Sequence, residues 1–376
     1  MNPTPQICRR CLLPEGKFNV RLDESGLCNY CRFWDETGAS LLDVERHRHL
    51  LVDRMQRSRG QFHYDAMVGL SGGKDSTYVL HQLTSKYQAN VLSVTFDNGF
   101  LSAYAWRNVR EIVRALGVDH YFYRPDWEAF RAFYRASVRK LGDPCVACSI
   151  GGYVLSIRGC RDVRAPFFIH GRSPMQMFRH WYPGTRDLGI GILRTNLKEH
   201  SIESLRKEYK TMIRKLRLLL LYLVPNVSLR HRISRELLGS RFRSYDLTPE
   251  FLAFFLFEPY DEQEMVRHLE ALDTGYRRPE NHAILGHGDC LIHDASAYLY
   301  ETKHGVNRVL PDLAAMIRQG GIDQDDAHDI LAANTPSEED IEISIGHLLE
   351  RLEMTRDEFE AVVSRLKRKA TRTPFS

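Results

Sequence analysis

Short apolar runs alternate with helical patterns of apolar residues through the first half of the chain. The runs read as buried strands, and they occupy residues 65–70, 90–97, 120–124 and 165–171. The helical patterns lie between them, at residues 76–86, 103–116 and 127–141. Strands that alternate with helices are typical of a parallel sheet covered on both faces. The sequence therefore predicts an α/β fold for this half.

The alternation ends near residue 185. Residues 200–272 and 291–368 show helical spacing, and a basic stretch runs from Arg206 to Arg243. Inside that stretch, an apolar stripe is typical of a helix that packs on a core, and it consists of Leu216, Leu219 and Leu220. We favour a solvated helical face for the basic residues over contacts with RNA phosphates. Four regions are therefore expected: a short N-terminal module, an α/β domain, a basic helical insertion and a helical C-terminal region, at residues 1–40, 41–185, 186–285 and 286–376.

Composition and charge narrow the functional classes only slightly. The chain has 376 residues, is 43% hydrophobic and 27% charged, and carries a formal net charge of +4. This is ordinary globular composition, and so mild a basic excess neither requires nor excludes RNA. The longest apolar stretch is well short of the roughly 20 residues that a membrane span needs, and the N-terminus lacks a secretion pattern. We expect no membrane association and a cytoplasmic location.

A glycine-rich turn follows the first strand run and precedes a helix. Its six residues are Ser71, Gly72, Gly73, Lys74, Asp75 and Ser76. The glycines allow the backbone to approach an anion closely, and the free N–H groups at the helix start attract negative charge. The serine hydroxyls and the lysine ammonium add hydrogen bonds and charge. The turn is not the Walker pattern GxxxxGK[ST], so kinase or GTPase chemistry is not implied.

This turn resembles the SGGxDS signature of the PP-loop ATP pyrophosphatases, whose fold is Rossmann-like, of the adenine nucleotide alpha hydrolase type. The resemblance implies that the loop grips the phosphates of ATP, that a substrate oxygen is adenylated, and that pyrophosphate leaves. Lys74 and Mg²⁺ would then stabilise the developing charge, and Asp75 would bind the metal or orient the loop. Phe96 and Asp97 would flank adenosine, and Gly171 would lie beside the nucleotide. The alternative for Asp97 is a turn residue that ends its strand.

Four cysteines near the N-terminus form two CxxC pairs with sixteen residues between them: Cys8, Cys11, Cys28 and Cys31. Two such pairs at this spacing are typical of a four-thiolate zinc ribbon. The segment is too short and polar to build a core of its own, so Zn²⁺ would be that core. Because protein fills all four ligand positions, we expect a structural zinc site.

A second cysteine set consists of the CxxC pair Cys145 and Cys148 together with the distant Cys290. Three thiolates suit a [4Fe–4S] cluster with one iron left open, and an open iron can hold sulfide. Three alternatives stay open: a redox pair that carries persulfide, a second zinc site with His287 or His293, and a purely structural role.

Cys160 lies outside that set, in surroundings that are typical of a helix end. We interpret it as a packed thiol.

The order of these motifs resembles two branches of the PP-loop family. Zinc-type pairs, SGGKDS, a CxxC pair and a distant cysteine resemble the iron–sulfur-dependent tRNA thiolation enzymes. The opening CRRCLLP, the later GLCNYC, the LGDP segment at 141–144 and the helical tail resemble the N-acetyl sugar amidotransferases of surface-polysaccharide biosynthesis. Amide transfer needs ammonia and no thiolates, so the cysteines after LGDP favour sulfur.

The sequence thus predicts an ATP-dependent sulfurtransferase, with Lys74, Asp75 and the three cysteines at its centre. Its substrate would be a small molecule such as a nucleobase or natural-product precursor, or tRNA, and it would need a sulfur donor. The alternative is an N-acetyl sugar amidotransferase that receives ammonia from a glutaminase subunit. A third hypothesis is a zinc-ribbon RNA-binding protein without activity, and the intact Lys74 argues against it. A homodimer is among the assemblies considered.

Overall fold

The structure is a computed structural model, and it describes residues 6–41, 43–178, 202–238, 249–272, 274–277 and 288–372. A single five-stranded parallel sheet forms the centre of this part of the chain, in the order β3-β2-β1-β4-β5. The strands are β1 (Ala66–Gly69), β2 (Val91–Phe96), β3 (Asp119–Tyr123), β4 (Phe167–His170) and β5 (Glu250–Ala253). The predicted α/β class with a parallel sheet is confirmed.

The fifth strand was not predicted, because the sequence pattern between 200 and 272 was interpreted as helical. β5 pairs in parallel with β4, where Phe168 lies opposite Phe251 and Ile169 opposite Leu252. It continues into a 3₁₀ turn, η1 (Phe254–Leu256), and every side chain from Phe251 to Phe257 is buried. A short run that is buried on all sides shows neither strand nor helix periodicity, so only the pairing with β4 reveals the strand.

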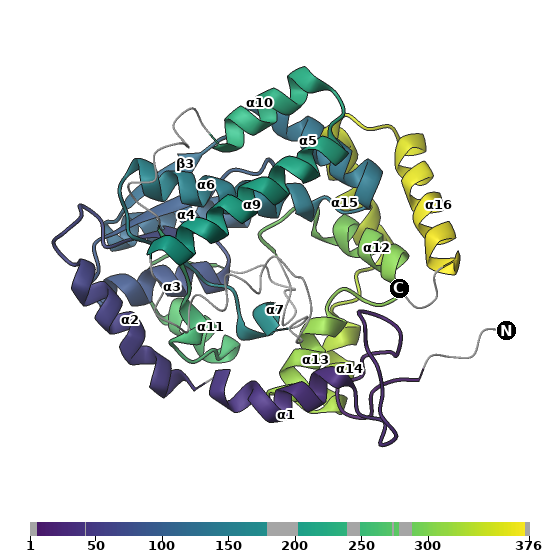
Figure 1. Ribbon diagram of the computed structural model, residues 1–376, viewed down its shortest axis with the longest axis horizontal. Helices are drawn as coiled ribbons and strands as arrows, with labels where there is room; N and C mark the ends of the chain where they lie inside the picture. The colour runs from purple at the N-terminus through teal and green to yellow at the C-terminus, as the bar shows by residue number, and fades with distance from the viewer. Residues whose placement is uncertain are drawn as a thin grey trace.

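Helices cover both faces of the sheet (Figure 1). One face carries α3 (Lys74–Ser85) and α4 (Ala103–Leu116), with α2 (Val44–Ser58) and α11 (Glu262–Ala271) packed in the same apolar core. The other face carries α6 (Cys145–Asp162), which contacts β1, β2 and β4.

A second apolar core lies on the α6 side of the sheet and joins α6 to several neighbouring helices. They are α5 (Trp127–Leu141), α9 (Ile202–Leu223), α10 (Val227–Leu238) and the C-terminal helices. Leu216 and Leu220 are buried in this core and Leu219 packs against it, so the predicted stripe does face a core. The apolar residues Leu218 and Leu221 on the same helix are exposed.

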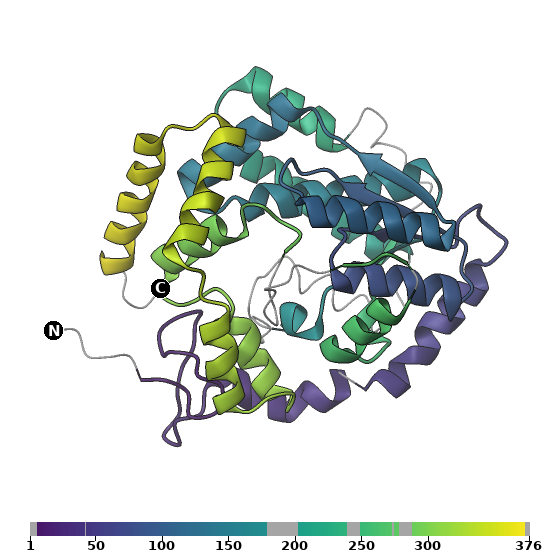
Figure 2. The same ribbon diagram turned by 180° about the vertical axis from the view of Figure 1, so that it is seen from behind.

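The C-terminal region forms two groups of helices (Figure 2). α12 (His293–His304) packs against α15 (Glu338–Leu352) and α16 (Arg356–Arg372), and the latter two contact α5. α13 (Leu310–Arg318) contacts α14 (Gln324–Ala333) and the short α7 (Pro174–Phe178). The helical character predicted for this region is therefore present in the described part of the chain.

The N-terminal module lies beside α13 and α14 (Figure 1). Its cysteines share a small core with Ala314 of α13, and the guanidinium of Arg318 lies 5.6 Å from the ring centre of Tyr30. α1 (Asn29–Leu41) leads from the module toward α2. The domain boundaries drawn from the sequence stay predictions. Within the described residues, no helix is both long enough and apolar enough to cross a membrane.

Candidate active site

The glycine-rich turn lies at the carboxyl end of β1 and opens into α3, as predicted. The side chain of Ser76 receives a hydrogen bond from the backbone N–H of Ser71 at 3.1 Å and donates to the carbonyl of Gly73 at 3.2 Å. The N–H of Gly73 in turn donates to the hydroxyl of Ser71 at 3.3 Å. The two serines thus hold the turn in shape, and α3 begins at Lys74 with no side chain capping its N-terminus. Uncapped N–H groups at a helix start can bind an anion.

Two glycines are required by close backbone contacts around this turn. Gly72 has φ +80°, and a Cβ atom on it would lie 2.4 Å from the carbonyl oxygen of Ala105. A Cβ on Gly171, which follows β4, would lie 3.0 Å from the backbone of Asp75. The end of β4 therefore reaches the first turn of α3, which is why Gly171 lies beside the loop.

Charged side chains gather around Lys74. Its ammonium lies 3.4 Å from a carboxylate oxygen of Glu262 and 3.8 Å from one of Asp75. Burial would lower the pKa of Lys74, but these two carboxylates raise it above its ordinary value. Burial raises the pKa of Asp75 to about 6 although Lys74 acts in the opposite direction, and the hydroxyl of Tyr260 donates to Asp75 at 3.3 Å. A phosphate group entering here would compete with Glu262 for Lys74.

The CxxC pair occupies the first turn of α6. The carboxylate of Asp143 accepts a hydrogen bond from the N–H of Cys145 at 2.8 Å, at the start of the helix. Residues three apart lie on the same face of a helix, so Cys145 and Cys148 point in a common direction. Both line the cavity described below.

Cys290 reaches the pair through an unpredicted strand-like pairing of two distant segments. Leu101 and Cys290 form an antiparallel bridge, and the N–H of Leu291 donates to the carbonyl of Phe100 at 2.9 Å. The N–H of Ser102 donates to the carbonyl of Asp289 at 3.0 Å. The segment therefore runs beside the turn that follows β2, near the glycine-rich turn of residues 71–76 (the phosphate loop). Asp289 lies close enough that a Cβ on Gly73 would be 3.5 Å from its carboxylate.

One cavity of about 950 Å³ brings the two motifs together. Its wall includes all six residues of the phosphate loop and all three cysteines of the second set: Ser71, Gly72, Gly73, Lys74, Asp75, Ser76, Cys145, Cys148 and Cys290. The wall also includes Phe96 and Gly171, two of the three residues expected beside the nucleotide. Asp97, the third, is not among the lining residues. Its carboxylate accepts from the N–H of Gly99 at 3.1 Å and from Arg124 at 2.8 Å.

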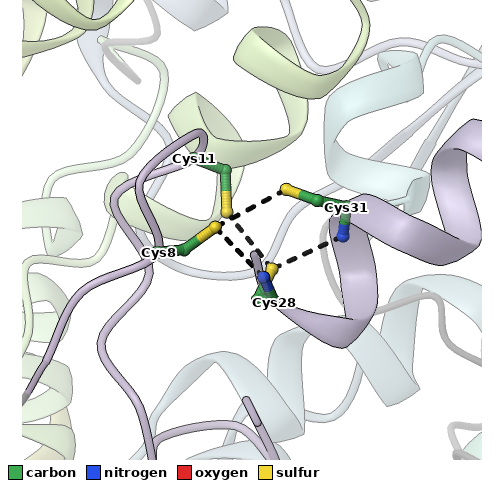
Figure 3. Close-up of side chains that lie close together, drawn as sticks. All are labelled: Cys8, Cys11, Cys28 and Cys31. Carbon is green, nitrogen blue, oxygen red and sulfur yellow. Dashed lines mark hydrogen bonds between the residues drawn. The ribbon is translucent and has the colours of Figure 1, made fainter. Parts of the chain in front are cut away.

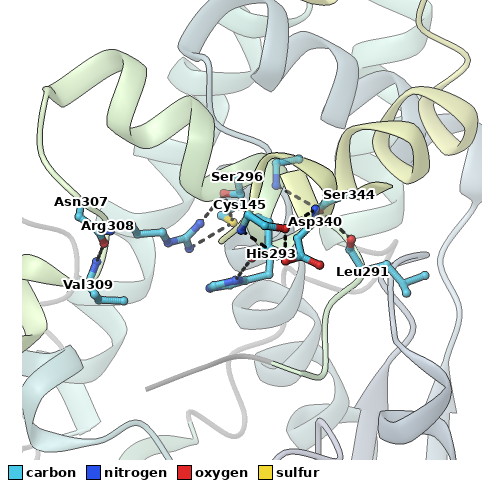
Figure 4. A network of polar contacts seen from close by, with 12 residues as sticks. Cys145, Leu291, His293, Ser296, Asn307, Arg308, Val309, Asp340 and Ser344 are labelled. Carbon is cyan, nitrogen blue, oxygen red and sulfur yellow. Dashed lines mark hydrogen bonds and ion pairs between the residues drawn. The ribbon is translucent and has the colours of Figure 1, made fainter. Parts of the chain in front are cut away.

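Polar side chains lie beside the sulfur atom of Cys145 (Figure 4). The hydroxyl of Ser296 lies 3.1 Å from Sγ of Cys145, and Nη2 of Arg308 donates to the same sulfur at 3.5 Å. Arg308 also contacts Ser296. The side-chain amide of Asn98 donates to Sγ of Cys148 at 3.3 Å.

Burial governs the protonation of two of these thiols. It raises the pKa of Cys148 to about 11, and Cys145 acts in the same direction, whereas Asn98 and Tyr134 lower it. Burial also raises the pKa of Cys290 well above its ordinary value. Thiols in such surroundings ionise readily only beside a compensating positive charge.

Several functional candidates were missed in the sequence. Asn98 follows the end of a strand, a position that could have been singled out. Glu262 and Arg308 line the cavity, and Ser296 contacts Cys145. None of the three carries a local sequence pattern, because long-range packing alone brings them there.

The four N-terminal cysteines converge on one point (Figure 3). Their sulfur atoms all lie within 4.8 Å of one another and are buried. Backbone N–H groups donate to two of them, from Cys28 to Sγ of Cys8 at 3.3 Å and from Cys31 to Sγ of Cys28 at 3.4 Å. Four converging thiols with N–H donors fit a tetrahedral metal such as zinc. This arrangement fits the predicted zinc-ribbon-like site.

The structure also places Cys160 and His293, two further residues considered in the sequence. Cys160 is fully buried among apolar residues of α6 and the sheet, where burial raises the pKa of its thiol, and it is not among the residues that line the cavity. His293 lines the cavity and its Nδ1 lies 3.0 Å from Asp294. His287 lies outside the described residues.

Comparison with known proteins gives one family match and several structural likenesses. Residues 275–373 match the family described as "LPS biosynthesis protein WbpG-like, C-terminal domain". No curated protein matches the chain.

Among solved structures, the chain is similar to the U34-tRNA thiolase NcsA from Methanococcus maripaludis with its [4Fe-4S] cluster. The identity is 13%, 87% of this chain and 88% of that chain are covered, and the TM-score is 0.35. The chain is also similar to the NH3-dependent NAD synthetase from Campylobacter jejuni. The identity is 15%, 53% of this chain and 96% of that chain are covered, and the TM-score is 0.30. A third similar structure is NMN synthetase from Francisella tularensis, with 16% identity and a TM-score of 0.27. The similarity covers 37% of this chain and 59% of that chain, so the chain spans little more than half of that protein.

TM-scores of this size do not establish an activity, so the assignment of the fold rests on the strands and the loop themselves. A parallel sheet carries the SGGKDS turn at the carboxyl end of β1, and helices cover both of its faces. The chain therefore has the parallel α/β sheet and the phosphate-loop sequence that the resemblance to PP-loop enzymes predicts.

Proposed function

We propose that this protein is an ATP-dependent sulfurtransferase that adenylates a substrate carbonyl oxygen and replaces that oxygen with sulfur. The observation that carries the proposal is the common cavity of the phosphate loop and of Cys145, Cys148 and Cys290. A reaction that first activates an oxygen and then delivers sulfur needs both groups within reach of one bound substrate. The substrate would be a small molecule with a carbonyl group, or tRNA.

The phosphate loop would bind ATP through its backbone N–H groups and through Lys74. In this structure Glu262 lies against Lys74, and the phosphates would take its place. When the substrate oxygen attacks the α-phosphorus and pyrophosphate leaves, negative charge grows on the phosphate oxygens. The ammonium of Lys74 is placed to stabilise that charge. Asp75 and Glu262 present carboxylate oxygens beside it, the ligand type that Mg²⁺ prefers.

The second cysteine set fits an iron–sulfur group in three respects. Three thiols face one cavity, they come from α6 and from the 288–291 segment, and hydrogen-bond donors surround the pair. Cys145, Cys148 and Cys290 would be the ligands. When bound, a [4Fe–4S] cluster with three protein thiolates supplies an open iron that can hold sulfide. The four N-terminal cysteines would hold a separate, structural Zn²⁺.

The test is a metal and turnover analysis of protein purified without oxygen. We expect about four iron and four sulfide per chain and about one zinc. Cys145→Ala should lose iron and sulfur transfer while it keeps zinc, whereas Cys160→Ala, which removes a buried thiol away from the cavity lining, should keep all three. Full sulfur transfer by Cys145→Ala would contradict the proposal.

A second candidate is amide transfer to an acetylated sugar nucleotide, with ammonia from a glutaminase partner. The match of residues 275–373 to a domain named for LPS biosynthesis favours it. It predicts pyrophosphate release with ammonia and without iron or sulfide. Zinc alone in the wild type, even after reconstitution with iron and sulfide, together with ammonia-dependent turnover would select this candidate.

A further inference from the structure

A fully buried tyrosine faces the second cysteine set from α5. Tyr134 has no exposed surface, and its hydroxyl makes no hydrogen bond to any described nitrogen or oxygen atom. Its ring is held edge-on by Phe100, with ring centres 5.2 Å apart. Cys148 and Cys290 pack against the same core as Tyr134, and the hydroxyl interacts with the thiol of Cys148. A buried hydroxyl that reaches only a thiol is poorly satisfied, and a group bound at the cysteines would give it a stronger acceptor.

A half-buried cation faces the same set from the Cys145 end of the CxxC pair. Arg308 precedes α13, and its guanidinium donates to Sγ of Cys145 and to Ser296. Asp143 and Asp312 also act on this guanidinium, and each of them favours its charge. A half-buried guanidinium is stabilised by nearby negative charge, and an anionic sulfur group beside it would add to that of the two carboxylates.

Asn98 completes the surroundings of Cys148. Its amide nitrogen donates to Sγ at 3.3 Å, while its carbonyl oxygen accepts from the N–H of Phe100 at 2.8 Å. The hydrogen bond from Phe100 fixes the orientation of the Asn98 amide, so its N–H₂ group is directed at the sulfur of Cys148. Hydrogen bonds from such outer groups orient metal ligands and tune the metal.

From these contacts we infer that Tyr134, Asn98 and Arg308 are positioning residues that hydrogen-bond the sulfur atoms of the iron–sulfur group and set its reduction potential. The inference rests on the proposed function, since it requires that Cys145, Cys148 and Cys290 hold such a group. One-electron reduction adds one negative charge to the group. Donors and a cation beside the sulfur stabilise the reduced form, and so raise the potential. Removing any of them should shift the potential to more negative values.

The measurement is a redox titration of the reconstituted full-length protein, followed by electron paramagnetic resonance, after iron has been counted. Tyr134→Phe keeps the buried ring and removes only the hydroxyl. We expect it to keep its iron and to have a more negative midpoint potential than the wild type. Tyr123→Phe is the matched control, because the hydroxyl of Tyr123 donates to Glu236 at 2.6 Å. It should leave the potential unchanged.

A second pair of variants tests the cation. Arg308→Lys keeps the positive charge and Arg308→Gln removes it, so the shift should be larger in Arg308→Gln. Iron-containing variants that all have the wild-type potential would overturn the inference and leave the proposed function standing. A wild type that holds no iron after reconstitution would overturn both. If Arg308→Gln fails to fold, Tyr134→Phe decides alone.

Discussion

Gly72 shows how a single residue shapes the phosphate loop. Its φ of +80° lies in the left-handed region, and a Cβ would meet the carbonyl of Ala105 at 2.4 Å. We expect Gly72→Ala to weaken ATP binding about tenfold or more, because relieving the clash with Ala105 moves the loop, and a loss of about 1.4 kcal/mol is tenfold in affinity. Calorimetric titration with ATP measures this.

Gly117 offers a matched control for that substitution. It has φ +60° at the end of α4, and a Cβ there would meet nothing within 4 Å. Gly117→Ala should lower the free energy of unfolding by a similar strain term and leave ATP affinity unchanged. Equal ATP affinity in the two variants would show that the close approach to Ala105 is not required.

His170 gives the stability of the protein a predictable dependence on pH. Burial, with Arg172, lowers its pKa to about 3, and its Nδ1 accepts from the N–H of Arg172 at 3.3 Å. Between about pH 6.5 and 3 the unfolded chain therefore holds a proton that the folded chain lacks. Its contribution to stability is complete above about pH 6.5 and is lost as the pH falls.

Replacing this histidine should flatten the pH dependence. In His170→Asn the amide oxygen can keep the hydrogen bond from Arg172, and near pH 5 the slope of the unfolding free energy should fall by about 1.4 kcal/mol per pH unit. Urea denaturation at a series of pH values measures the slope. The slopes of the two proteins should coincide above about pH 7, and coincidence at pH 5 as well would contradict the burial argument.

At the scale of elements, the position of Cys290 depends on a helix that the sequence does not connect to it. Ser344 of α15 donates to the carbonyl of Leu291 at 2.9 Å and accepts from the N–H of Ala295 at 3.0 Å (Figure 4). Through these two bonds, α15 holds both the segment after Cys290 and the start of α12. α15 therefore supports one wall of the cavity without lining it.

Ser344→Ala should loosen that wall. It leaves a buried carbonyl and a buried N–H without a partner, which costs about 1–3 kcal/mol, and Cys290 should react faster with an alkylating reagent. Urea denaturation and mass spectrometry of the alkylated protein measure the two effects. Ser85→Ala, which removes an exposed hydroxyl bonded to His81, is the control. An unchanged Cys290 alkylation rate would show that α15 does not position the segment.

The helices and strands also show where sequence patterns predict secondary structure and where they fail. Amphipathic helices such as α4 and α5 follow from their apolar spacing, and their observed bounds, Ala103–Leu116 and Trp127–Leu141, agree with the prediction. β5 does not follow in this way, because a run buried on all sides has no period. Its identity as a strand depends on the partner that it finds in β4.

At the scale of the whole molecule, the N-terminal module that contains the four converging cysteines is attached to the C-terminal helices. Ala314 of α13 lies in the core of the cysteine module, Arg318 stacks on Tyr30, and Gln324 of α14 donates to the carbonyl of Arg10 at 3.0 Å. The start of the chain is thus anchored to a segment more than three hundred residues later. Loss of a metal bound at the four cysteines should therefore destabilise α13.

We expect Cys11→Ser to lose zinc, to lower the melting temperature by several degrees, and to keep iron at the second set. Hydrogen exchange should become faster along α13. Metal analysis, calorimetry and hydrogen-exchange mass spectrometry measure these effects, and Cys160→Ala should keep its zinc. Unchanged exchange along α13 in zinc-free protein would show that the module and the helix are independent.

The sequence by itself determined the phosphate loop, the strands β1 to β4 of the parallel sheet around it and the four paired cysteines of the N-terminal module. These are local features, in which neighbouring residues fix the backbone or supply several ligands at short spacing. Only the tertiary structure decided that Cys145 and Cys290 share a cavity with Lys74, and that Asn98, Tyr134 and Arg308 surround the sulfur atoms. The physical reason is that these contacts join segments up to about two hundred residues apart, and long-range packing of this kind leaves no periodic or spacing pattern in the chain.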